Sequence, residues 1–112
     1  MISVALEFKG ELFTALEVDG HASSGQEDAL VCNSVSVLTQ TFEESVLRLV
    51  SEDGFTVENS KGKSRMRRVS KALRRKECDI LDPLVRNYLV GIKMVKEQFH
   101  GQITLELQKT KP

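Results

Sequence analysis

Residues 28–49 read DALVCNSVSVLTQTFEESVLRL, the longest stretch of the chain with a helical apolar pattern. Its apolar side chains recur at steps of three and four residues, which places them on one face of a helix. This apolar stripe consists of Val31, Val35, Leu38, Phe42, Val46 and Leu49. Asp28 can cap the start of the helix and complement its positive end. The stretch therefore predicts an amphipathic helix that buries one face.

A β-hairpin is expected before this helix. Apolar and polar residues alternate over residues 2–9, and a second alternating run covers residues 12–18 after a break at Gly10-Glu11. Alternation with a period of two is typical of a strand with one buried face. Asp19-Gly20 ends the second strand, and the small polar residues 22–27 predict a loop.

A second helix and two further strands are expected after it. Residues 55–59, beyond Gly54, predict a third strand, and residues 103–107 predict a closing strand. Asp82-Pro83 is a good start for a helix, since proline is favoured at the first helical position. An apolar stripe then runs from Val85 to Phe99, and Gly91 within it predicts a close approach of a neighbouring backbone.

Residues 61–76 carry nine basic side chains and no acidic one. Met66, Val69 and Leu73 would share a helical face, but Arg65–Ser70 also fits an edge strand, where charges discourage aggregation. We favour the strand because residues 59–62, Asn-Ser-Lys-Gly, are typical of a hairpin turn. The element order is then ββαββαβ. Residues 1–112 are expected to form a single α+β domain, with two helices packed on a mixed or antiparallel sheet of about five strands.

The composition excludes several classes of protein. At 112 residues, 40% hydrophobic and 29% charged, the chain is neither disordered nor collagen-like. Its N-terminus lacks the basic region of a secretory signal, and no apolar run is long enough to cross a membrane, so we expect a cytoplasmic protein. The two cysteines and two histidines lack metal-ligand spacing, so neither a metal nor another cofactor is expected.

The formal net charge is zero, but it hides an asymmetry. Residues 1–60 hold eleven acidic and two basic side chains, whereas residues 61–112 hold fourteen basic and five acidic ones. No uniform field for gripping DNA is expected, and an acidic surround in the first half could attract a basic substrate.

Cys32 and His21 are the candidate catalytic pair. His21 ends a strand, and Cys32 lies in the first turns of the helix that follows. A helix N-terminus stabilises a thiolate, and a nearby imidazole can take and return a proton. A lone cysteine in a helix is usually a packing residue, however, and a histidine after a glycine is usually a turn residue. Spacing alone leaves both readings open. Cys78 and His100 have no such arrangement.

These residues resemble a known family. Gly20-His21-Ala22, a short polar loop and then Val31-Cys32-Asn33-Ser34-Val35-Ser36 look like the signature of the bacterial ribosomal-processing cysteine proteases (Prp). The resemblance spans nearly the whole chain. It implies a homodimeric Cys–His peptidase that removes a short N-terminal extension from a protein of the large ribosomal subunit, with that precursor as substrate.

Carried over residue by residue, the resemblance makes Cys32 the nucleophile and His21 the general base and acid. Ser36 is a motif position with a possible supporting role. Many relatives have an aspartate at the position of Ala29, and here Asp28 precedes it, so Asp28 could steer His21. The loop Ser23-Ser24-Gly25 is a candidate lid over the substrate.

The alternative is a non-enzymatic module that binds ribosomal or other RNA through the basic residues 61–76. This segment contains no aromatic residue that could stack on a base. A solvated, charged strand explains it equally well.

Overall fold

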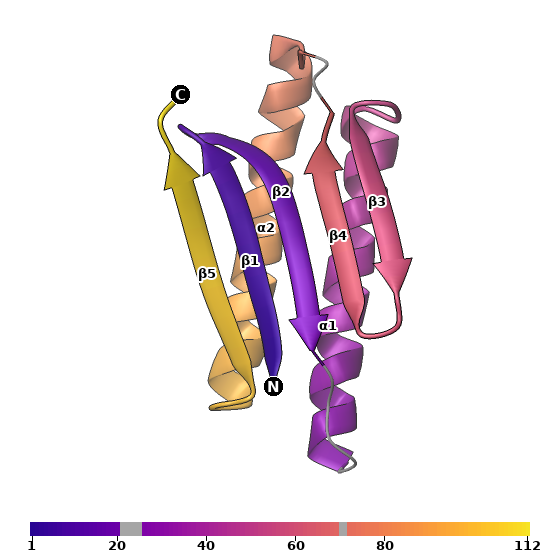
Figure 1. Cartoon of the computed structure of the whole chain (residues 1–112), viewed down its shortest axis with the longest axis vertical. Helices are drawn as coiled ribbons and strands as arrows, with labels where there is room; N and C mark the ends of the chain where they lie inside the picture. The colour runs from indigo at the N-terminus through magenta and orange to yellow at the C-terminus, as the bar shows by residue number, and fades with distance from the viewer. Residues whose placement is uncertain (21–25, 70–71) are drawn as a thin grey trace.

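A five-stranded sheet and two long helices make up the fold (Figure 1). The computed structural model describes residues 1–20, 26–69 and 72–112. In chain order the elements are β1 (Ile2–Lys9), β2 (Leu12–Gly20), α1 (Gln26–Ser45), a π-helical turn (Val46–Val50), β3 (Phe55–Ser60), β4 (Lys63–Arg68), α2 (Arg75–Gln98) and β5 (Ile103–Thr110). The predicted ββαββαβ order is confirmed.

The sheet is mixed, with the strand order β3-β4-β2-β1-β5. β1 and β5 are parallel, whereas the β1–β2, β2–β4 and β3–β4 pairs are antiparallel. Both helices lie on the same face of the sheet (Figure 1). The prediction of a strand at residues 65–70 is confirmed by β4, but its placement at the edge is wrong, because β4 lies between β3 and β2.

The basic residues of β4 are matched by acidic residues on neighbouring strands. Lys63 and Arg65 lie 3.1 and 3.4 Å from the Glu17 carboxylate on β2, and Arg67 lies 3.5 Å from Glu7 on β1. The hydrogen bonds from Lys63 and Arg65 lower the pKa of Glu17. Such exposed pairs contribute little stability, but they neutralise charge. The acidic and basic halves of the sequence therefore meet at the β2–β4 pairing.

The core is centred on aromatic rings between the sheet and the helices. The Phe13 ring on β2 lies 5.4 Å from Phe42 on α1 and 6.2 Å from Phe55 on β3, between ring centroids. Phe42 in turn stacks on Tyr88 of α2 at 4.9 Å. These four side chains are at most 4% exposed. The cluster joins the second and third strands to both helices.

Helix α1 differs from its prediction at both ends. It begins at Gln26, so Asp28 is its third residue and not its cap. At the other end Leu49 is 58% exposed and Val50 is buried. The cause is the π-helical turn at Val46–Val50, which contains extra backbone per turn and shifts the buried face by one residue.

Helix α2 begins about two turns earlier than predicted, so Asp82-Pro83 lies inside it. At the observed start of the helix, the Glu77 carboxylate accepts a hydrogen bond from the Arg74 backbone N–H at 2.8 Å. This bond gives an acceptor to a backbone N–H that has none within the helix. Gly91 faces α1, where an added Cβ would lie 2.8 Å from a methyl group of Leu38. The close approach expected at Gly91 is therefore made by a side chain and not by backbone.

Candidate active site

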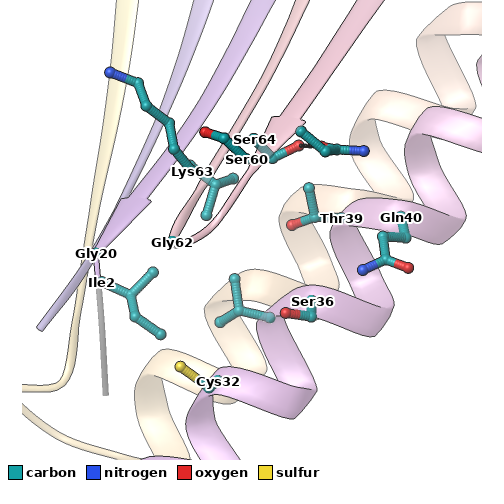
Figure 2. Close-up of a pocket in the computed structure, with 13 residues that line it drawn as sticks. Ile2, Gly20, Cys32, Ser36, Thr39, Gln40, Ser60, Gly62, Lys63 and Ser64 are labelled. Carbon is teal, nitrogen blue, oxygen red and sulfur yellow. Dashed lines mark hydrogen bonds between the residues drawn. The ribbon is translucent and has the colours of Figure 1, made fainter. Parts of the chain in front are cut away.

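An open cleft of about 400 Å³ lies where β2 ends, between helix α1 and the β3–β4 hairpin. Figure 2 shows Cys32, Ser36 and Gln40 following one another along α1 on one side. Ser60, Gly62, Lys63 and Ser64 of the hairpin form the opposite wall, and Ile2 and Gly20 close one end near Cys32.

Cys32 is a free, half-buried cysteine that lines this cleft while packing against the core. Its neighbours Val31 and Val35 are each 2% exposed and hold this part of α1 to the sheet. The prediction that Cys32 lies in the early turns of the helix is confirmed, although it is the seventh residue and belongs to the second turn.

Gly20 brings the chain into the same cleft. Its φ angle is +134°, and an added Cβ would collide with the carbonyl oxygen of Met1, so only glycine fits. The Gly20 N–H donates to the carbonyl of Gly62 in the hairpin turn at 3.0 Å. β2 therefore ends at the cleft that contains Cys32, one residue before His21.

Several predicted site residues lie outside the described part of the chain. These are His21 and the loop Ser23-Ser24-Gly25. Ser36 is exposed and lines the cleft one turn after Cys32. Asp28 lies in the first turn of α1. Cys78 lines a different cavity, beneath the β1–β2 turn.

The hairpin wall is the part of the cleft that sequence reasoning missed. Its polar side chains, among them Asn59 and Ser64, come from a segment for which the sequence predicts only strand and turn. Of the described residues that line the cleft, Lys63 alone is charged, and it is paired with Glu17. The described lining therefore does not provide the acidic surround that was expected for a basic substrate.

A polar network runs from the cleft into the core. Cys32, Ser36, Thr39 and Glu43 follow one another at helical spacing, and Thr39 and Glu43 are only 2% and 3% exposed. The Thr39 and Tyr88 hydroxyls are hydrogen-bonded at 2.9 Å. The Ser64 hydroxyl lies 2.7 Å from Glu43 Oε2. Helix α1 is thus joined to α2 by a buried hydrogen bond and to β4 by a partly buried one.

Glu43 is a buried carboxyl with a perturbed acidity. Burial raises its pKa above 4.5, and the hydrogen bond from Ser64 only partly opposes this. Burial likewise raises the pKa of Tyr88, and the nearby Glu43 charge adds to the effect. The low-dielectric surroundings therefore favour the neutral form of both groups.

We expect this carboxyl to make the folded protein less stable as pH rises. Above pH 4.5 the unfolded chain loses the Glu43 proton while the folded chain retains it, so the free energy of unfolding falls until the pH passes the raised pKa. The Glu43→Gln variant has no carboxyl at this position, so its free energy of unfolding lacks this dependence on pH. Urea unfolding between pH 4 and 8 should show the wild type losing stability relative to Glu43→Gln as pH rises. Parallel curves would contradict this expectation, and the exposed Glu44→Gln is the control.

No group of three or more metal-ligating side chains occurs within residues 1–20, 26–69 and 72–112. In that same part of the chain, neither helix is long and apolar enough to cross a bilayer.

The sequence matches a family model over residues 1–104, and that model describes the cysteine protease Prp. The chain belongs to the Prp family of cysteine proteases. No curated protein sequence matches it. The Prp fold is also found in solved structures. The essential ribosomal processing protease Prp of Staphylococcus aureus, in complex with a substrate peptide, has a TM-score of 0.78 at 20% identity, over 96% of this chain and 100% of that one.

Two further structures have the same fold. The Staphylococcus aureus Prp with a covalently linked product peptide has a TM-score of 0.76 at 21% identity, over 96% of this chain and all of that one. SMU.848 from Streptococcus mutans has a TM-score of 0.79 at 20% identity, over 98% of this chain and 99% of that one. Membership of the Prp family confirms the resemblance read from Gly20-His21 and from the residues around Cys32.

Proposed function

We propose that this protease uses Cys32 as nucleophile and His21 as general base and acid, and that it removes a short N-terminal extension from a protein of the large ribosomal subunit. The observation that carries the proposal is the position of the Cys32 thiol, in an open cleft that also contains the end of the strand before His21. Few other groups in the described lining of the cleft could act as a nucleophile, since the rest are hydroxyls, amides and one paired lysine.

The reaction is an acyl transfer in two steps. His21 takes the thiol proton, and the Cys32 thiolate forms a bond to the scissile carbonyl carbon as the C=O π bond breaks, so that the carbonyl oxygen becomes an oxyanion. Backbone N–H groups at the start of α1 stabilise it, because the first four residues of a helix have no intrahelical acceptor. The C–N bond then breaks as His21 returns the proton to the leaving amine. Water, deprotonated by His21, releases the acyl group and restores the thiol.

Three further elements have proposed roles. Ser36 lines the cleft one turn from Cys32 and can donate a hydrogen bond to the bound peptide. Asp28, in the first turn of α1, is proposed to orient His21. The loop Ser23-Ser24-Gly25 joins β2 to α1 and serves as a lid that closes over the substrate.

An extended peptide of a ribosomal precursor is the substrate that this chemistry and the relatives favour. The cleft is open, and its small polar side chains can hydrogen-bond a peptide backbone. The related Prp of Staphylococcus aureus is described as a ribosomal processing protease and has been crystallised with a substrate peptide. A protein that acts on ribosome assembly in this way works in the cytoplasm and associates with ribosomal particles.

A homodimer is the oligomeric state we propose. Val37, Val90 and Met94 are each at least 57% exposed, beside the point where Leu38 of α1 meets Gly91 of α2. Apolar side chains gathered on an outer face are typical of an interface. The chain has a mass of 12.6 kDa, and sedimentation equilibrium should give twice this value. Val37→Asp should shift it to the monomer, and a monomeric wild type would contradict the proposal.

The direct test of the proposed function is cleavage of a precursor. The purified protein should shorten a large-subunit protein that carries an N-terminal extension, and the mass of the product should correspond to a single cut within that extension. An uncut precursor under reducing conditions would overturn the proposed substrate.

The RNA-binding alternative predicts affinity for ribosomal RNA that falls steeply with salt. The pairing of Lys63, Arg65 and Arg67 with glutamates does not favour it.

A further inference from the structure

A polar cluster joins the β3–β4 hairpin to helix α1; in it Glu43 is buried, Ser64 is half-buried and Asn59 is exposed. The Ser64 hydroxyl on β4 lies 2.7 Å from Glu43 Oε2 on α1 and 2.6 Å from Asn59 Oδ1 on β3. Asn59 and Ser64 are paired residues in the hairpin. Ser64 therefore joins both strands of the hairpin to the helix that carries Cys32.

The two short contacts of Ser64 require a donor besides Ser64 itself. A hydroxyl carries one hydrogen, so it donates one of these bonds and accepts the other. With Asn59 Oδ1 as acceptor, Ser64 donates to Asn59 and a protonated Glu43 donates to Ser64. With the Asn59 amide turned over, its NH₂ donates to Ser64 and Ser64 donates to a Glu43 carboxylate. In both arrangements Glu43 is bonded to Ser64, and a glutamine could take its place.

Burial of the Glu43 carboxyl costs free energy, so its position in the fold suggests a structural role. It is 3% exposed and three turns beyond Cys32 on the same helix. A buried carboxyl without a compensating partner is strongly destabilising, so the bond to Ser64 fixes where the hairpin can lie. Ser64 and Asn59 themselves line the cleft, and Figure 2 shows Ser64 on the wall opposite helix α1.

The hairpin has a second attachment near its turn. The Gly62 carbonyl accepts the Gly20 N–H at 3.0 Å, which ties the turn to the end of β2. The hairpin is thus joined to the strand that leads to His21 by this bond and by the pairing of β4 with β2, and to helix α1 by the contact between Ser64 and Glu43. Cys32 itself packs against the core beside Val31 and Val35, and the same core includes Phe55 and Met66 of the hairpin.

We propose that Glu43 is a positioning residue that acts through Ser64 to set the width of the cleft, and so the affinity for the peptide substrate. The proposal rests on the cleft being the substrate site, as proposed above. Glu43 does not touch the reacting atoms. Its loss lets the hairpin wall move away from α1, which weakens peptide binding and leaves the reactivity of the Cys32 thiol unchanged.

Glu43→Leu and Glu43→Gln separate positioning from a general loss of stability. Glu43→Leu removes the bond to Ser64 and should raise KM for the precursor peptide about tenfold, with kcat within about twofold of the wild type. Glu43→Gln retains a donor and an acceptor and should restore KM to within about twofold. The matched control is Glu44→Leu, one position along on the exposed face, which should change neither parameter.

Hydrogen exchange tests the same proposal without relying on activity. In Glu43→Leu and in Ser64→Ala, the amides of β3 and β4 should exchange about tenfold faster, while those of β1 and β5 keep their wild-type rates. If the wild type does not cleave the peptide, the proposed function fails and the exchange rates alone decide the role of Glu43. Unchanged hairpin exchange in Glu43→Leu, or equal KM in all four proteins, would overturn the positioning role.

Discussion

Replacing Cys32 by alanine is expected to abolish cleavage of the ribosomal precursor, with kcat falling at least about 10⁴-fold. The described residues around the cleft offer no second thiol, because Cys78 lines a cavity at a different place in the fold. Hydroxyls such as Ser36 are far weaker nucleophiles than a thiolate at neutral pH. The measurement is the rate of product formation, followed by mass, at equal concentrations of folded protein.

Cys78→Ala is the matched control for this prediction, since both cysteines are free and half-buried. It should retain wild-type kcat. Circular dichroism and urea unfolding should show that Cys32→Ala remains folded, because a half-buried thiol leaves only a small cavity. Cleavage by Cys32→Ala at more than a few per cent of the wild-type rate would exclude Cys32 as the nucleophile.

Replacing Phe13 by alanine is expected to have the largest effect on stability, a loss of about 3–5 kcal/mol. Phe13 is 2% exposed, and its ring contacts Phe8, Phe42 and Phe55 from three different elements. The cavity left behind would separate β2 from α1, the two elements that lead to His21 and carry Cys32. Since domains of this size are stable by about 5–15 kcal/mol, the variant should unfold at much lower urea concentration.

Leu107→Ala is the control for Phe13→Ala. Leu107 is 44% exposed on the edge strand β5, so its truncation should cost less than about 1 kcal/mol. A loss at Phe13 no larger than that at Leu107 would mean that the aromatic cluster does not hold the sheet to the helices.

The element order could be predicted from the sequence because it depends on local periodicity. The alternation in β1 and the three-and-four spacing in α1 are properties of neighbouring residues. The exposure of Leu49 could not be predicted, since a π-helical turn adds a residue without changing the apolar pattern before it. Proline is favoured at the start of a helix but is also tolerated inside one at a cost in stability. The start of α2 predicted from Pro83 was therefore wrong, because this proline lies inside the helix.

The candidate site was predicted only where it is local in sequence. Gly20 and Cys32 flank the loop that contains His21, and both line the cleft. The hairpin wall depends on the pairing of β2 with β4, which joins residues nearly fifty positions apart. A signal for Glu43 was nevertheless present. It continues the spacing of Cys32, Ser36 and Thr39, and that polar stripe passes from the cleft into the core.

The activation of Cys32 by His21 is the central claim, and the rate of thiol alkylation tests it most directly. Iodoacetamide should modify Cys32 faster than Cys78 near neutral pH, as followed by peptide mass in the wild type. In His21→Ala the Cys32 rate should fall to about that of Cys78, while the Cys78 rate stays the same. A Cys32 that reacts no faster than Cys78, or equally fast with and without His21, would contradict the account.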